Sequence, residues 1–135
     1  AKFICLVRNP YAQIEGKIRR HGTTAKEAAE LSIQYLKYQK QNIDSLRNVL
    51  LVKYEILTED TENEKNSIIT FIPELSVINT ELKFNAHNLR AEKNMKITNL
   101  NSEKISKLTK GDLTIIKSVF KKEESILNYF NYQII

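Results

Sequence analysis

Two short apolar runs constrain the fold of this chain more than any other feature. The first is Phe3 to Val7 and the second lies within "VLLVKY", residues 49–54. Both are dense in the β-branched and apolar residues that favour buried strands. The residues between them have a helical pattern. A strand, a helical crossover and a second strand form a βαβ unit, so the spacing predicts a parallel sheet flanked by helices and hence an α/β fold.

The crossover carries signals for two helices. Pro10 suits the first turn of a helix that continues to about Arg20, and Gly22 ends it. Thr24 can cap the next helix, because Glu27 stands three residues later and completes a capping box. We expect this second helix to reach about Leu46. Four of its larger or apolar residues fall on one side: Ala28, Leu31, Tyr35 and Tyr38.

The second half of the chain is expected to be mainly helical. "SIITFIPEL" predicts a short helix that ends or kinks just before Pro73. Residues 79–100 show little periodicity and are interpreted as a long loop. Asn101 or Ser102 is expected to cap a helix that Gly111 stops, and Asp112 to cap the last helix. One apolar face runs along that last helix: Ile116, Val119, Phe120, Ile126, Leu127 and Phe130.

Composition excludes several classes of protein. With 135 residues, 41% hydrophobic and 27% charged, the chain has the size of one domain and is neither disordered nor membrane-spanning. One cysteine and two histidines provide no zinc ligand set and no internal disulfide. The net charge of +5 and pI near 9.3 favour an anionic partner.

Arg8 is the first candidate site residue. It ends the first apolar run just before a helix begins, which places a fixed fork of donors beside the positive end of a helix dipole. This arrangement is typical of phosphate and sulfate sites. The alternative is an arginine that forms an ion pair with a carboxylate at a strand end.

Other titratable residues have structural interpretations. Glu15 lies among basic residues of a helix and is expected to form an ion pair, while His21 is expected at a helix C-terminus. Glu55 is not assigned a catalytic role. Four residues of the predicted loop either form a solvated basic surface or reach an anionic ligand: His87, Arg90, Lys93 and Lys96.

Three segments, in order, resemble parts of the sulfotransferases that use 3′-phosphoadenosine 5′-phosphosulfate (PAPS). "FICLVRNPYAQIEG" resembles the strand and helix that bind the donor's 3′-phosphate. "VLLVKYEILTED" is similar to the family's Tyr-Glu-Asp-Leu element, with "IITFIPEL" after it. "LNSEKISKL" and "EESILNYFNY" resemble its C-terminal helices. The resemblance spans nearly the whole chain.

The resemblance implies a P-loop-like sulfotransferase fold of which residues 1–135 form a single domain or the C-terminal half. It implies that Arg8 binds the 3′-phosphate of PAPS and that Tyr54 lies against its adenine; filling the edge of the core is the alternative for Tyr54. Gly16 stands where the family has a serine, eight residues after the arginine. The 5′-phosphosulfate loop and catalytic base of the family lie upstream of Ala1. We therefore expect the upstream part of a longer protein, or a partner chain, to complete the sheet.

The predicted function is transfer of a sulfuryl group from PAPS to a hydroxyl or amine acceptor, whose identity the sequence leaves open. No catalytic or metal-binding residue is assigned. A nucleotide-binding α/β module that does not catalyse is the first alternative. A nucleic-acid-binding domain, suggested by the pI and by "KIRRHG", is the second alternative. It is not favoured, because no glycine-aromatic RNA motif or recognition-helix pattern is present, and no nucleic-acid partner is predicted. Localisation stays open, with the cytoplasm favoured by the single cysteine.

Overall fold

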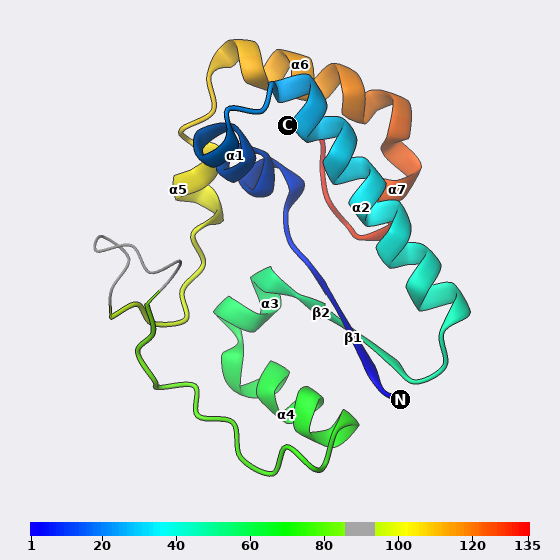
Figure 1. Cartoon of the computed structure of the whole chain (residues 1–135), viewed down its shortest axis with the longest axis vertical. Helices are drawn as coiled ribbons and strands as arrows, with labels where there is room; N and C mark the ends of the chain where they lie inside the picture. The colour runs from blue at the N-terminus through cyan, green and yellow to red at the C-terminus, as the bar shows by residue number, and fades with distance from the viewer. Residues whose placement is uncertain (86–93) are drawn as a thin grey trace.

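A parallel two-stranded sheet stands at the centre of the molecule, as predicted. The computed structural model describes residues 1–85 and 94–135 (Figure 1). Strand β1 (Phe3–Val7) pairs with β2 (Val49–Lys53) so that Phe3 faces Val49 and Val7 faces Lys53. Helices α1 (Pro10–His21) and α2 (Ala25–Ser45) form the crossover between them. The βαβ unit and the α/β class are therefore confirmed.

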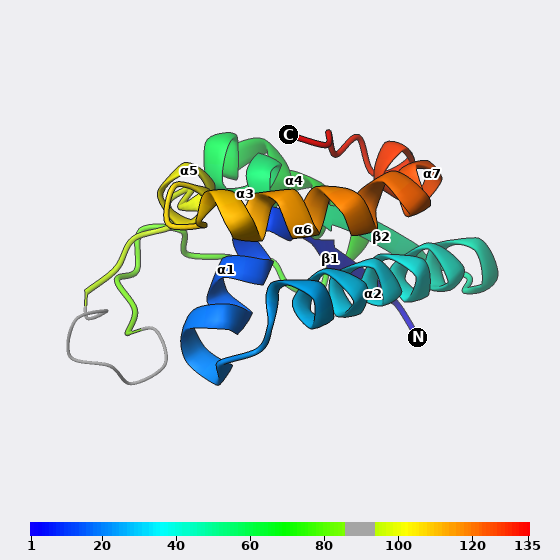
Figure 2. The same ribbon diagram turned by 90° about the horizontal axis from the view of Figure 1, so that it is seen from above.

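The remaining described elements are helices. They are α3 (Tyr54–Glu59), α4 (Thr61–Phe71), α5 (Asn101–Ile105), α6 (Lys110–Phe120), a short 3-10 helix (Lys121–Glu123) and α7 (Glu124–Tyr129). Figure 1 shows α2 and α7 on one side of the two strands and α3 and α4 on the other. Figure 2 shows α6 running beside α2, with which it is in contact. Helix α5 packs against α1, which brings a segment late in the chain next to the first helix.

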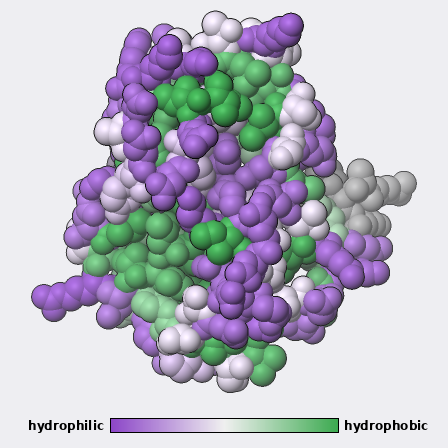
Figure 3. All heavy atoms as spheres, turned by 180° about the vertical axis from the view of Figure 1, so that it is seen from behind, coloured by the Kyte–Doolittle hydropathy of each residue, from purple (hydrophilic) through white to green (hydrophobic). Residues whose placement is uncertain are grey.

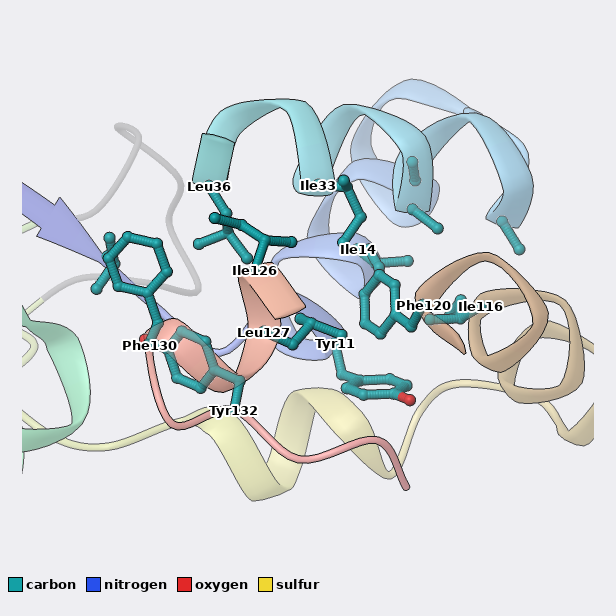
Figure 4. Packing of buried hydrophobic residues seen from close by; sticks show 14 of the residues in the cluster. Tyr11, Ile14, Ile33, Leu36, Ile116, Phe120, Ile126, Leu127, Phe130 and Tyr132 are labelled. Atoms are coloured by element: carbon teal, nitrogen blue, oxygen red, sulfur yellow. The ribbon is translucent and has the colours of Figure 1, made fainter. Parts of the chain in front are cut away.

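The hydrophobic core lies between the crossover helices and the C-terminal helices. Tyr11 and Ile14 of α1 meet Phe120 of α6 and Leu127 of α7, and all four side chains are almost fully buried (Figure 4). The rings of Tyr11 and Phe120 contact edge to face, with centroids 5.0 Å apart. This packing fixes α1, and therefore the segment that follows β1, against the rest of the molecule.

The buried face of α2 differs from the one that the sequence suggested. Leu31, Tyr35 and Tyr38 are exposed, and the helix buries a neighbouring face instead. That face consists mainly of small residues: Ala25, Ala28, Ala29, Ser32, Ile33 and Leu36. Small side chains let α1 and α6 approach the helix closely, and this close packing outweighs the burial of larger side chains.

Several helix ends also differ from the predictions. Residue Tyr54 begins α3 rather than ending the strand, and α4 begins at Thr61, inside the acidic stretch. The cap of α6 is Thr109, whose capping box with Asp112 places Gly111 inside the first turn. The predicted stop at Gly111 and the cap at Asp112 are therefore wrong.

Other helix ends match the sequence signals. The capping box of Thr24 with Glu27 is present, and Gly22 ends α1 in the left-handed conformation with φ of 61°. Pro10 occupies the first turn of α1. Helix α4 ends at Phe71, before Pro73.

The outer edge of β1 is unpaired in the sheet, whose only strands among the described residues are β1 and β2. On β1, Ile4 and Leu6 are exposed, whereas Cys5 is only 5% exposed because it faces the helices. The Tyr35 hydroxyl donates a hydrogen bond of 2.7 Å to the Leu6 carbonyl. Figure 3 shows hydrophobic areas on the surface between polar ones.

Within residues 1–85 and 94–135, no helix is long and apolar enough to cross a membrane.

Candidate anion-binding site

Arg8 lies immediately after β1 and is held from two sides. Its Nε donates a hydrogen bond of 2.8 Å to Oδ1 of Asn101 at the start of α5. Its guanidinium carbon lies 4.0 Å from the ring centroid of Tyr54, in a cation–π contact. The Nη2 atom is buried and has no hydrogen-bond partner among the described residues. Because a buried donor without a partner is costly, this nitrogen is a candidate ligand-binding atom.

Glu55 organises the residues around Arg8. Its Oε1 accepts hydrogen bonds of 2.7 Å from the backbone N–H of Asn9 and from Nδ2 of Asn101. Its Oε2 accepts one of 3.1 Å from the Tyr132 hydroxyl. Burial, together with the Glu55 carboxylate, raises the pKa of Tyr132 far above its ordinary value, so the phenol keeps its proton. Glu55 is therefore a structural centre, in agreement with the sequence interpretation.

The link between Arg8 and this carboxylate is indirect. Asn101 accepts from Arg8 with its oxygen and donates to Glu55 with its nitrogen, so a neutral amide stands between the two charges. None of the ion pairs formed by the described residues includes Arg8. The alternative of a direct strand-end ion pair thus does not describe Arg8, whose positive charge is oriented without contact with an acid.

Tyr54 is fixed at its hydroxyl end as well as at its ring. The hydroxyl accepts a hydrogen bond of 3.1 Å from the backbone N–H of Leu100 and donates one of 2.9 Å to the Thr98 carbonyl. These bonds join the start of α3 to the segment before α5. The structure therefore brings the two predicted site residues, Arg8 and Tyr54, into direct contact.

Two cavities meet at Arg8. The larger has a volume of about 410 Å³ and lies between α1, α2 and α5. Its lining is mainly polar and basic: Arg8, Gln13, Glu15, Gly16, Lys17, Arg19, Arg20, His21, Ser32, Tyr35 and Lys104, with Ala12. The smaller, about 280 Å³, is more apolar: Arg8, Arg20, Tyr54, Leu57, Thr58, Phe84, Met95, Lys96, Ile97, Thr98, Leu100 and Lys104. Arg8, Arg20 and Lys104 line both.

Positive charge dominates the larger cavity. Its carboxylate, Glu15, already forms an ion pair with Arg19 at 2.8 Å, which confirms the role predicted for Glu15. Across the parts of the chain that the structure describes, no ion pair links Arg8, Lys17, Arg20 or Lys104 to a carboxylate. A cavity with this surplus of cations attracts an anionic group.

The N-terminus of α1 contributes less to the site than the sequence suggested. Asn9 caps the helix, and its Oδ1 accepts a hydrogen bond of 3.0 Å from the backbone N–H of Tyr11. This N–H is thus already paired within the protein. The guanidinium of Arg8, rather than the N-terminus of α1, is therefore the principal hydrogen-bond donor for an anion at this site.

The other predicted residues have different positions. His21 is the last residue of α1, as predicted, and lines the larger cavity, whereas Lys96 lines the smaller one. His87, Arg90 and Lys93 lie outside the described residues. The predicted cap at Asn101 or Ser102 is wrong: α5 begins after Leu100 without a side-chain cap, and the Asn101 side chain contacts Arg8 instead.

Ser32, Asn101 and Lys104 were missed as site residues. Ser32 and Lys104 lie within predicted helices, where nothing in the sequence distinguishes them from other polar residues. Asn101 is separated by 93 residues from the arginine that it contacts. Their only sequence signal is polarity within predicted helices, which is shared by many surface residues.

Comparisons of the chain with models of known protein families, with curated proteins and with solved structures found no match.

Proposed function

We propose that this chain forms the part of a PAPS-dependent sulfotransferase that binds the donor's 3′-phosphate and adenine, within a P-loop-like fold. The observation that carries the proposal is the buried, unpartnered Nη2 of Arg8 at the junction of a basic cavity and an apolar one. A 3′-phosphorylated nucleotide combines a strong anion with a flat apolar base. The two cavities match these two parts.

The basic cavity suits the phosphate. A guanidinium binds phosphate oxygens through several donors at once, and Arg8 has its Nε fixed by Asn101 while Nη2 remains free of protein partners among the described residues. Arg20 and Lys104 add positive charge at the junction. The guanidinium is therefore oriented before the ligand arrives, which reduces the entropic cost of binding.

The apolar cavity suits the adenine. Tyr54 forms one wall next to Arg8, and Leu57, Met95 and Leu100 supply apolar surface. Aromatic and apolar side chains stack well on a nucleobase. With its hydroxyl bonded to the 98–100 segment, the Tyr54 ring keeps a constant position for such a contact.

In the proposed reaction, a sulfuryl group passes from PAPS to a hydroxyl or amine of an acceptor. The residues of this chain bind and orient the donor, which lowers the barrier by positioning. The upstream part of the protein or a partner chain supplies the loop around the 5′-phosphosulfate and the catalytic base.

A nucleotide-binding module without catalytic activity is the second candidate. The observation that favours it is Gly16, which lines the basic cavity without the hydroxyl that the resemblance implies at that position. A protein that binds adenosine 3′,5′-bisphosphate (PAP) but transfers no sulfate to a broad panel of acceptors would support this candidate.

Calorimetric titration with PAP, the product of the donor, tests the proposal. We expect micromolar binding that Arg8→Ala weakens by about 2 kcal/mol, or roughly 30-fold, because a charge-assisted phosphate contact is lost. Arg47→Ala is the matched control, since Arg47 is an exposed arginine between α2 and β2. The proposal is wrong if the unaltered protein does not bind PAP, or if both substitutions have the same effect.

A further inference from the structure

Ser32 stands out among the buried side chains of α2. It is fully buried, with 0% exposure, and its Oγ has no hydrogen-bond partner among the described residues. It also lines the basic cavity that contains Arg8. A buried hydroxyl without a partner destabilises a folded protein, so its presence beside a cavity points to a ligand.

Three other helical serines of this chain satisfy their hydroxyls within their own helices. Ser45 donates to the Gln41 carbonyl, Ser67 to the Asn63 carbonyl at 3.1 Å, and Ser118 to the Ile115 carbonyl at 2.7 Å. This backward bond is the usual solution for a serine inside a helix. Ser32 forms no such bond, and its hydroxyl therefore has no hydrogen-bond partner among the described residues.

The cavity has space for such a group next to α1. Gly16 lines it, and a Cβ added at Gly16 would meet no atom within 4 Å. Two buried donors without hydrogen-bond partners among the described residues thus border one open volume, the Arg8 guanidinium from the end of β1 and the Ser32 hydroxyl from α2. A guanidinium and a hydroxyl are both donors to phosphate oxygens.

We infer that the Ser32 hydroxyl donates a hydrogen bond to the same phosphate group that Arg8 binds, so that the phosphate lies in the basic cavity between α1 and α2. The inference rests on the proposed function for the identity of the nucleotide. It assigns to α2 the hydroxyl that α1 lacks at Gly16. Lys17 and Lys104 border the same cavity and add to its positive potential.

Glu15 is compatible with a phosphate in this cavity. Its Oε2 has no partner among the described residues, and a carboxylate repels an anion. However, its Oε1 is paired with Arg19 at 2.8 Å, and the cations without a carboxylate partner outnumber it. The potential of the cavity as a whole therefore stays positive.

Ser32→Ala separates a ligand-binding role from a purely structural one. Alanine removes only the hydroxyl and is the best helix former, so we expect a higher Tm for the free protein. At the same time we expect PAP to bind about tenfold more weakly. A structural serine would not produce both changes. Ser118→Ala, which removes a hydroxyl from α6, should leave PAP binding unchanged.

A second substitution tests whether a hydroxyl at another position of the cavity can replace that of Ser32. In the Ser32→Ala background, Gly16→Ser returns a hydroxyl to the same cavity from α1, where the structure has room for it. We expect this double variant to recover most of the lost affinity. Titration with adenosine 5′-monophosphate, which lacks the 3′-phosphate, should show no difference between the unaltered protein and Ser32→Ala.

The outcomes distinguish the inference from the function on which it rests. If PAP binds and depends on Arg8 but not on Ser32, the inference is wrong and the proposed function stands. If PAP does not bind, inorganic phosphate serves as the probe. Phosphate binding that is weakened by Ser32→Ala would then support the cavity assignment without the nucleotide, and phosphate binding that is absent or unchanged would overturn it.

Discussion

Asn101 connects the two charged residues at the centre of the site. Its amide oxygen holds Arg8 and its amide nitrogen holds Glu55, and the residue itself is only 7% exposed. An aspartate there would neutralise the guanidinium and would repel Glu55. The neutral amide fixes the arginine in one orientation and leaves its positive charge without a carboxylate partner among the described residues.

Asn101→Ala should therefore weaken PAP binding by about 5- to 10-fold, because Arg8 loses its fixed orientation and one side chain must be ordered on binding. Binding of adenosine 5′-monophosphate should change much less, since it lacks the 3′-phosphate. Calorimetry with both nucleotides measures the difference. Asn66→Ala, at an exposed position of α4, is the control. Equal losses for both nucleotides would mean that Asn101 supports only the local structure.

At the scale of the elements, short-range signals predicted more than long-range ones. The apolar runs, Pro10 and the box of Thr24 with Glu27 act within a few residues, and the structure has the predicted strands, helix start and cap. The expected burial of the first run is wrong for Phe3, Ile4 and Leu6, which are exposed because no further strand or helix covers them among the described residues. The start of α3 at Tyr54 was missed because the apolar pattern continues across the end of β2. The role of Asn101 depends on packing between α1 and α5, which no local pattern encodes.

The two glycines that were expected to end helices should respond differently to alanine. Gly111 lies within the first turn of α6, and an added Cβ would make only an ordinary contact of 3.7 Å with Thr109. Gly111→Ala should thus raise the free energy of unfolding by about 0.5–1 kcal/mol. Gly22→Ala should lower it by about 1 kcal/mol, because φ is 61° there. Denaturant titration of both variants measures these changes, and a destabilising Gly111→Ala would contradict the position of α6.

At the scale of the whole molecule, the C-terminal segment ties the helices to the sheet. Lys53 at the end of β2 donates a hydrogen bond of 2.6 Å to the Phe130 carbonyl, and its ammonium lies 4.6 Å from the ring centroid of Tyr132. The Tyr132 hydroxyl in turn reaches Glu55. The site thus depends on contacts between β2, α3 and residues 130–132, which are far apart in the sequence.

Tyr132→Phe should lower the free energy of unfolding by about 1–2 kcal/mol at neutral pH, because Glu55 loses a donor in a mostly buried position. The pKa of Tyr132 is raised in the folded protein, so this contribution is fully present below the ordinary tyrosine pKa of about 10 and is lost as the pH rises above it. Denaturation at neutral pH and near pH 11 measures the difference. A gap between the two proteins that does not shrink at high pH would contradict the raised pKa of Tyr132.

The single thiol of the chain reports on the stability of the strand that carries Arg8. Cys5 lies in β1 and is only 5% exposed, and burial raises the pKa of its thiol. A disulfide reagent can therefore react with the thiolate only when the strand detaches from the helices. The rate of modification thus measures the free energy of this local opening in the unaltered protein. A ligand bound by Arg8, at the end of the same strand, slows the reaction by the factor with which it stabilises the closed state.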